Sequence, residues 1–281
     1  MIGVIGGTGL YSIEGLTQVR TQAVETPFGP PSAEIVMGFF ESKPVAFLPR
    51  HGTRHSLLPS EINFRANIWA LKSVGVNQVI SVSAVGSLVK EIRPGDLALA
   101  TQYLDLTKGK REGTFFGDGL VAHISTARPT CLRLGKLTQD AASSLDIPLH
   151  VDKTYACVEG PRLGTKAESF FLKGAGCDLV GMTNVPEAFL AREAQLCYCP
   201  IAVATDYDCW LDDPDEHVTL EKVMALYKEK LGQVQEILKQ LFSKQEENAT
   251  CGCRRALKDA VLTPSSALDS DKKSLLDFLL T

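Results

Sequence analysis

The chain has 281 residues, of which 44% are hydrophobic, enough for one large globular domain with a substantial core. Its formal net charge of −4 argues against a nucleic-acid groove or an anionic membrane surface as the main partner. No apolar run reaches the roughly 18 residues of a membrane span, and the N-terminal MIGVIGGTGLY lacks the basic start of a signal peptide. The eight cysteines are therefore expected to be reduced thiols in a cytoplasmic protein.

Strand-like and helix-like segments alternate along the chain. Strands are predicted at residues 3–5, 33–40, 44–48, 77–82, 96–100, 150–158, 179–181 and 201–204. Helices are predicted at about 59–74, 129–145, 187–195 and 219–243, with others beginning at about 165 and 251. Residues 103–127 between them form a long irregular segment, and loops of this length are usually functional or part of an interface. The alternation is typical of an α/β fold.

The first predicted strand is followed at once by Gly6-Gly7-Thr8-Gly9. Glycines at a strand end let backbone N–H groups approach a ligand, and a nest of such groups favours an anion. The Thr8 hydroxyl adds a donor, although a plain tight turn is an equal alternative. A dinucleotide loop is disfavoured, because Ser12 stands where its fingerprint has a further glycine.

The strand at 44–48 runs into the most basic stretch of the chain, residues 49–55. Arg50 offers a planar fork of donors that suits phosphate. His51 and His55 are four residues apart, which on a helix could mark a metal site, but Gly52 favours a loop and the HExxH glutamate is missing. Phosphate binding is favoured over metal binding here, with a solvated basic loop as the alternative.

Residues 201–210, IAVATDYDCW, begin as a buried strand and end in two carboxylates, Asp206 and Asp208. In an extended chain this spacing puts both on one face, where burial is costly unless a partner satisfies them. The edge of an adenine ring, with N7 beside the 6-amino group, is such a partner. Ligands of open α/β sheets bind outside the carboxyl ends of strands. The residues expected to converge there are Thr8, Arg50, Ser83, Thr183 and Asp206.

Two Cys-x-Cys pairs, Cys197/Cys199 and Cys251/Cys253, carry four of the eight cysteines. Together they could bind zinc, but structural zinc sites usually show wider ligand spacing. Buried thiols with an exposed, oxidisable pair at Cys251 and Cys253 are the favoured interpretation.

Several segments together resemble the 5′-methylthioadenosine phosphorylases of the trimeric purine nucleoside phosphorylase type. The resemblance spans most of the chain. Its matching pieces are GVIGGTGL (3–10), TPFGPPS (26–32), RHGTRHSLLPS (50–60), NFRANIWALK (63–72), SAVGSL (83–88), EGPR and AES (159–169), MTNVPE (182–187) and ATDYDCW (204–210). It implies a nucleoside phosphorylase domain over residues 1–264, with a central mixed sheet flanked by helices. Residues 265–281 are expected to form a polar tail, poorly ordered or reaching onto a neighbouring subunit.

The resemblance also implies which residues bind which part of the substrates. Those implied for phosphate are Thr8, Arg50, His51, Ser83, Ala84 and Thr183. Those implied for the nucleoside are Met182 at the ribose, Leu163, Asp206 and Asp208 at the base, and His55, Leu220, Val223, His123 and Leu262 at the 5′-methylthio group. His123 and Leu262 would reach the site from an adjacent subunit, so the family implies a homotrimer or a dimer of trimers.

The implied reaction is phosphorolysis of methylthioadenosine to adenine and methylthioribose 1-phosphate, without cofactor or metal. Asp206 would protonate or hydrogen-bond N7 of the leaving base, and Asp208 would accept from the 6-amino group. Two sequence departures stand out: Ser83 replaces a threonine, and Leu163 replaces a phenylalanine. A phosphorylase of broader specificity, acting on adenosine or methylthioinosine, is the alternative enzyme. An adenosine-binding regulatory protein is the alternative without catalysis.

Overall fold

A computed structural model describes residues 1–7, 10, 13–211, 220–245 and 251–281. Nine strands occur in this part of the chain: β1 Ile2–Gly6, β2 Leu16–Gln22, β3 Ile35–Phe40, β4 Lys43–Pro49, β5 Gln78–Ser87, β6 Leu97–Leu106, β7 Leu149–Val158, β8 Leu179–Gly181 and β9 Cys197–Asp206. Its α-helices are α1 Phe64–Ser73, α2 Leu132–Ser144, α3 Lys166–Gly174, α4 Asn184–Glu193, α5 Leu220–Ser243 and α6 Ser270–Leu280. Short 3₁₀ turns span Pro59–Glu61, Gly252–Arg255 and Ser265–Ala267.

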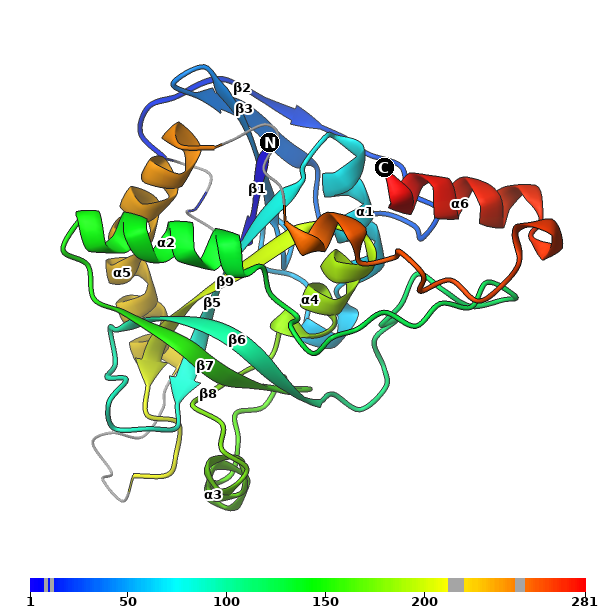
Figure 1. Cartoon of the computed structure of the whole chain (residues 1–281). Coiled ribbons are helices and arrows are strands. Elements are labelled where there is room, and N and C mark those ends of the chain that lie inside the picture. Colours follow the sequence, from blue (N-terminus) through cyan, green and yellow to red (C-terminus); the bar gives the residue numbers. More distant parts are fainter. Residues whose placement is uncertain (8–9, 11–12, 212–219, 246–250) are drawn as a thin grey trace.

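The strands form one mixed sheet that closes on itself at one end (Figure 1). Strands β4, β1, β5 and β9 run parallel in that order, and β2 and β3 add an antiparallel edge beside β4. Strand β5 also pairs with β8, which leads through β7 and β6 back to β9. These five strands therefore make a small closed barrel beside the open sheet. The predicted fold class, α/β with a central mixed sheet, is confirmed.

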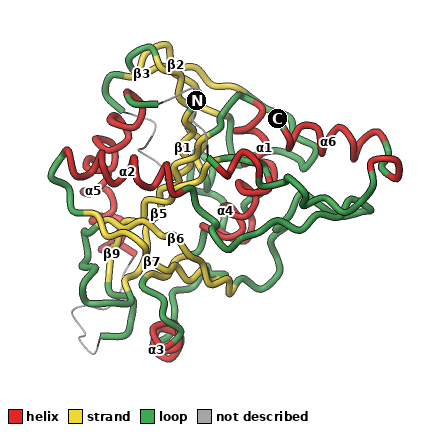
Figure 2. The backbone as a smooth tube through the Cα atoms, in the orientation of Figure 1, coloured by secondary structure: helices red, strands yellow, loops and turns green. Residues whose placement is uncertain are grey.

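Helices cover both faces of the open sheet, as the tube in Figure 2 shows. Helices α2 and α5 pack against each other on one face, where Leu134 and Leu238 meet Val4 and Ile201 of the sheet. Helices α1 and α4 pack on the other face, where Ile68 and Ala191 join a second core cluster. Because successive side chains of a strand point to opposite sides of the sheet, each strand contributes apolar residues to both faces. No helix among the described residues is long and apolar enough to cross a membrane.

Several boundaries differ from the sequence prediction because pairing extends strands beyond their apolar runs. The small residues 83–87, predicted to follow a strand, lie inside β5, which pairs with β9 and β8 through Gly86. Strand β6 continues to Leu106, so the long loop begins at 107 and not at 103. The helix predicted from 251 is only a 3₁₀ turn, Gly252–Arg255. The capping box predicted at Thr165 and Glu168 is confirmed at the start of α3. The predicted cap of α5, Thr219, lies outside the described residues.

The expected polar tail, residues 265–281, is instead a helix packed on the chain's own core. Helix α6 begins at a capping aspartate, Asp269, whose side chain accepts from the Lys272 N–H at 2.8 Å. Its Phe278 ring stacks on Trp69 of α1 with centroids 3.8 Å apart, and Leu279 is fully buried. Figure 1 shows α6 beside α1. The apolar residues near the end of the tail thus complete a core face.

Leu279→Ala should lower the free energy of unfolding by about 2–5 kcal/mol, because it leaves a cavity in that core. Leu280→Ala is the matched control: its side chain is 48% exposed, and its effect should stay within about 0.5 kcal/mol. Urea unfolding of both variants measures the difference. Equal effects would show that α6 does not pack on this core.

Candidate active site

The carboxyl ends of four parallel strands meet at one edge of the sheet. Strand β1 ends beside the end of β4, and the Arg50 N–H that follows β4 donates to the Gly6 carbonyl at 3.0 Å. Strands β5 and β9 run side by side to the pair Gly86 and Asp206. The loops after these strands therefore open on the same region, as expected for a ligand site of an α/β sheet.

Thr183 reaches this edge by a different route. Strand β8 is antiparallel to β5, with Gly86 opposite Val180. The chain leaves β8 at Gly181, and Thr183 is the residue before α4, where its N–H donates to the Tyr155 hydroxyl at 3.4 Å. Ser83 and Gly86 are three residues apart on β5, so about 10 Å separates the serine from the neighbourhood of Asp206. That span suits a small molecule with two polar ends.

Asp206 and Asp208 come together through a turn. Strand β9 ends at Asp206, and Asp208 has a left-handed backbone with φ of 52°. The Asp208 N–H donates to Asp206 Oδ1 at 2.8 Å. A Cβ on Gly86 would lie 3.1 Å from Asp206 Oδ1 and 3.2 Å from Asp208 Cβ, so only glycine leaves room for this turn. The predicted pairing on one face of an extended strand is therefore wrong, although the two carboxylates are neighbours.

Each carboxylate is held by one side-chain hydroxyl. Thr205 Oγ1 donates to Asp206 Oδ2 at 2.7 Å, and Ser169 Oγ of α3 donates to Asp208 Oδ2. A carboxylate has about four lone-pair positions, so each group keeps acceptor capacity for a ligand. Ser169 and Thr205 had no role in the sequence prediction. Ser169 does lie in the matched segment AES, which was the available signal.

Burial is the main reason why both acids hold their protons more tightly than usual. It raises the pKa of Asp206 above its ordinary value, while hydrogen bonds from Thr205 and the Asp208 N–H oppose the change and the Asp208 charge adds to it. Burial also raises the pKa of Asp208, against the hydrogen bond from Ser169. The expected rise at Asp206 is therefore present, but burial contributes more than the neighbouring carboxylate.

Two buried hydroxyls at this edge lack a partner within the described part of the chain. Ser83 and Thr183 are each 7% exposed, and neither Oγ of Ser83 nor Oγ1 of Thr183 has a hydrogen-bond partner there. Leaving such a group unsatisfied costs about 1–3 kcal/mol. Unsatisfied buried groups are uncommon in native proteins and often mark a place where a ligand supplies the missing partner. Ala84 follows Ser83 on β5 and is partly buried.

Arg50 points its guanidinium into the protein, which differs from the open fork expected from the sequence. Nε and Nη2 donate to Glu187 of α4 at 2.7 and 2.9 Å. Nη2 also donates to Ser81 Oγ at 2.6 Å, and Nη1 to the Val82 carbonyl at 2.9 Å. Of the five N–H donors of an arginine, only one at Nη1 is left over. Arg50 is 1% exposed, so it acts mainly as a buried positive charge behind the site.

His51 is neutral and oriented by the backbone. Its Nδ1 lies 2.9 Å from the Leu57 carbonyl, which can only accept, so Nδ1 carries the proton and Nε2 is an acceptor. Burial lowers its pKa to about 4. The ring stacks on His55, 4.4 Å away between centroids. His51 can therefore accept a hydrogen bond from a protonated phosphate oxygen.

An arginine that the sequence prediction missed organises the segment around Met182. Arg111, from the long loop, donates through Nη1 to the Met182 and Val185 carbonyls at 2.7 Å each. Its Nε pairs with Glu159 at 3.0 Å, and its side chain is 2% exposed. Glu159 lies in the matched segment EGPR, but nothing in the spacing links it to Arg111. Distant segments paired only by tertiary contact leave no local sequence pattern.

The remaining predicted residues fall into three groups. Leu163 is half exposed and precedes Gly164, where a Cβ would lie 3.8 Å from both carboxylate oxygens of Asp208. Val223 lies in the first turns of α5, four residues before Tyr227, whose ring is 3.8 Å from the position of a Cβ on Gly7. Thr8 and the side chain of Leu220 lie outside what the structure describes.

His123 and Leu262 lie together, away from the carboxylates. Ala122 and Val261 form an antiparallel bridge, His123 N–H donates to the Ala260 carbonyl, and Leu262 N–H to that of Val121, both at 2.9 Å. His123 is exposed, and Leu262 is 64% exposed. Within this chain they are joined to each other and not to Asp206.

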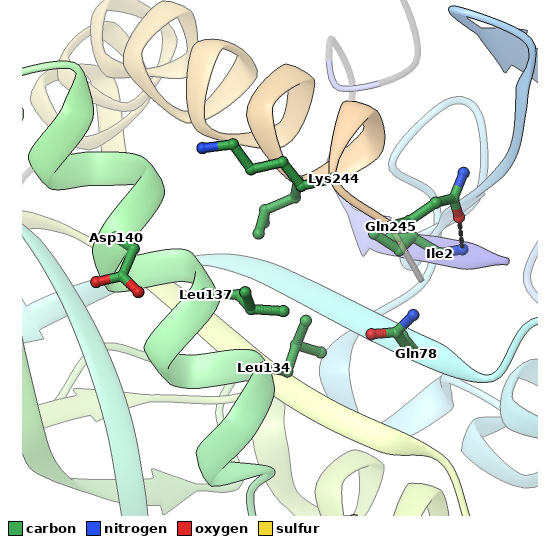
Figure 3. Close-up of a pocket in the computed structure, with 8 residues that line it drawn as sticks. Ile2, Gln78, Leu134, Leu137, Asp140, Lys244 and Gln245 are labelled. Carbon is green, nitrogen blue, oxygen red and sulfur yellow. Dashed lines mark hydrogen bonds between the residues drawn. The ribbon is translucent and has the colours of Figure 1, made fainter. Parts of the chain in front are cut away.

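A separate hollow lies between α2 and α5, at the other end of the sheet (Figure 3). Its lining includes Ile2 and Gln78, the first residues of β1 and β5, and Gln245 Oε1 accepts from the Ile2 N–H at 3.1 Å. Eight residues of β5, about 26 Å, separate Gln78 from the neighbourhood of Asp206. This hollow is therefore not part of the candidate site.

Similarity to known proteins identifies the family of this chain. Residues 1–243 match the family model described as the phosphorylase superfamily. The S-methyl-5′-thioadenosine phosphorylase of Geobacter sulfurreducens is 45% identical over 280 residues, covering 100% of this chain and 98% of that protein. The chain belongs to the phosphorylase superfamily, as a member of its methylthioadenosine phosphorylase family. The resemblance inferred from the sequence motifs is thereby confirmed.

Solved structures of the methylthioadenosine phosphorylase family share the fold. A methylthioadenosine phosphorylase from an antarctic soil metagenomic library is 41% identical with a TM-score of 0.92, covering 100% of this chain and 98% of that one. The methylthioadenosine phosphorylase of Schistosoma mansoni in complex with adenine is 37% identical with a TM-score of 0.82, covering 86% and 90%. The first likeness covers the whole chain and therefore includes the strand end that carries the carboxylates.

Glu187→Gln should lower the free energy of unfolding by about 3–5 kcal/mol, because it leaves the buried Arg50 charge without a counter-charge. Glu236→Gln is the matched control. Its partner Lys239 lies 2.7 Å away on the surface of α5, and such pairs contribute about 0.3–0.5 kcal/mol. Chemical denaturation of both variants gives the comparison. A cost at Glu187 no larger than at Glu236 would contradict the structural role of the buried pair.

Proposed function

We propose that this enzyme cleaves S-methyl-5′-thioadenosine with orthophosphate, releasing adenine and 5-methylthioribose 1-phosphate. One observation carries the proposal: two partly buried acids with raised pKa, and two buried hydroxyls without a hydrogen-bond partner among the described residues, lie at one sheet edge of a methylthioadenosine phosphorylase family member. The acids suit a purine edge that offers both an acceptor and a donor, and the hydroxyls suit an anion. An adenine complex of a family member supports nucleoside binding at this fold.

Asp206 is proposed as the general acid. Glycosidic cleavage leaves negative charge on the purine, and a proton shared with N7 stabilises it. The raised pKa of Asp206 keeps a proton available, and Thr205 holds Oδ2 in place at 2.7 Å. Asp208, steadied by Ser169, would accept from the 6-amino group and disfavour a 6-oxo group. The two acids thus divide catalysis and base selection.

Phosphate is proposed to bind where Ser83 and Thr183 present their free hydroxyls, with His51 accepting from a phosphate hydroxyl. The Arg50 charge lies behind this position and can add one Nη1–H. Bound phosphate is both the nucleophile and a negative charge beside the developing positive charge on the sugar. Ala84 and Thr8 belong to the same proposal by family position. On this scheme phosphate is a substrate, and the chain needs no cofactor for the reaction.

The site at the 5′ end of the nucleoside is proposed to be completed by a neighbouring subunit. His55, Leu220 and Val223 would come from one chain, and His123 and Leu262 from the next. The exposure of His123 and Leu262 supports this arrangement. A homotrimer, or a dimer of trimers, in the cytoplasm therefore remains part of the proposal.

Adenine release should require added phosphate and should be fast with methylthioadenosine, whereas methylthioinosine and inosine should be cleaved roughly 10⁴-fold less efficiently. Assays of these nucleosides and of adenosine, each with and without phosphate, give the comparison as kcat/KM. Phosphate-independent release, or binding without release as in a regulatory protein, would contradict phosphorolysis. Equal cleavage of methylthioinosine would contradict the role of Asp208. The kcat/KM for adenosine, relative to that for methylthioadenosine, measures how strongly the 5′ pocket selects the methylthio group.

Asp206→Asn should lower kcat for methylthioadenosine by about 10²–10⁴-fold, with little change in phosphate affinity. Because the folded-state pKa of Asp206 is raised, its ionisation lowers stability fully above that pKa, and the cost fades as pH falls from it to the ordinary pKa of an aspartate. The neutral variant should therefore be no less stable than the parent near neutral pH. Phosphate titration and urea unfolding are the controls. Unchanged kcat would exclude Asp206 as the proton donor.

A further inference from the structure

Four cysteines from three distant segments meet in one cluster. The Sγ atoms of Cys131, Cys197, Cys251 and Cys253 all lie within 4.8 Å of one another. Cys131 caps the start of α2, Cys197 is the first residue of β9, and Cys251 and Cys253 flank the glycine that begins the 3₁₀ turn after α5. This set differs from the four cysteines grouped by sequence spacing.

Cys199 is not one of the clustered cysteines, because it lies farther along β9, beside the middle of α2. Its sulfur lies 3.6 Å from Thr138 Oγ1 of α2. Cys131 takes the fourth position instead, fixed by its N–H bond to the Tyr198 carbonyl at 2.8 Å. The tight Cys-x-Cys spacing that disfavoured zinc therefore applies to one half of the cluster only.

The sulfur positions are close to those of a tetrahedral tetrathiolate centre. With Zn–S bonds of about 2.3 Å, the sulfurs of a regular tetrahedron lie about 3.8 Å apart. Here Cys131 and Cys251 are separated by 3.9 Å, and Cys197 and Cys251 by 3.2 Å. Each sulfur is within reach of one central ion without a change of fold.

The residues around the cysteine cluster supply positive charge and hydrogen-bond donors to its sulfur atoms. Arg133 Nη2 lies 4.0 Å from the Cys197 sulfur and donates to Gln78 Oε1, while its buried Nε and Nη1 have no hydrogen-bond partner in the described chain. The Leu134 N–H donates to the Cys131 sulfur at 3.5 Å, at the N-terminus of α2. A partly buried cation whose buried donors have no partner is costly beside four neutral thiols, whereas thiolates compensate it.

We propose that these four cysteines bind one Zn²⁺ as a structural tetrathiolate centre. Binding releases the thiol protons and leaves a net charge of −2, which Arg133 and the N-terminus of α2 partly offset. The centre would tie the segment after residue 250 to α2 and β9. It lies at the opposite end of β9 from Asp206, nine residues or about 30 Å away along the strand, so it takes no part in phosphorolysis.

The test is the metal content of the full-length protein purified with reductant and then supplied with Zn²⁺ and desalted. Elemental analysis should find about one zinc ion per chain. Cys251→Ala, at the half-buried position of the cluster, should lose it. Cys199→Ala, a buried cysteine two residues from Cys197, should keep it. Zinc at the same level in both variants would overturn the assignment, as would its absence from the parent protein.

A second measurement does not depend on how the variants fold. Co²⁺ bound to the parent protein should give the intense visible absorption and sulfur charge-transfer bands of a tetrahedral tetrathiolate site, and Zn²⁺ should displace them. Alkylation after unfolding with chelator but without reductant should modify all eight cysteines. Only four modified thiols, with the cluster paired as disulfides, would overturn the proposal, and so would an octahedral cobalt spectrum.

Discussion

The buried ion pair between Arg50 and Glu187 is the contact on which the rest of the site depends. It joins the end of β4 to α4, and the same carboxylate accepts from Ser81 of β5 and Tyr198 of β9. Burial alone would lower the pKa of Arg50, but the charge and hydrogen bonds of Glu187 outweigh it and raise that pKa. Four elements are thus tied together around this ion pair, because neither charge tolerates burial alone.

The proposed site has two halves, the hydroxyls proposed to bind phosphate and the acids proposed to bind the base. The parallel register of β5 and β9 sets Ser83 and Asp206 at a fixed separation, and Thr183 follows β8, which pairs with the end of β5. The same burial that would make isolated carboxylates costly raises the pKa of both, which is the property that the proposed role of Asp206 as proton donor requires. On the proposed mechanism, the burial that the chemistry requires at Asp206 is therefore a cost to the stability of the ionised form.

The two ends of β9 carry different functional groups. Its carboxyl end carries the acids, whereas its amino end carries Cys197, against α2 and the segment that leads to α6. Helix α6 completes the core face around Trp69 and Phe278. The long C-terminal segment is therefore joined to the sheet at two places, the cysteine cluster and the α1 surface, both away from the proposed chemistry.

The sequence by itself determined the α/β class, most strand and helix positions, and the family, because apolar periodicity and short motifs are local. It also placed Arg50, Thr183 and Asp206 at or just past strand ends. Only the tertiary structure showed that Arg50 faces Glu187, that Asp208 turns out of the strand, and that Ser169 and Arg111 support the site. It also replaced Cys199 by Cys131 and the polar tail by α6. These features arise from contacts between residues far apart in the chain, and such contacts produce no regular residue spacing in the sequence.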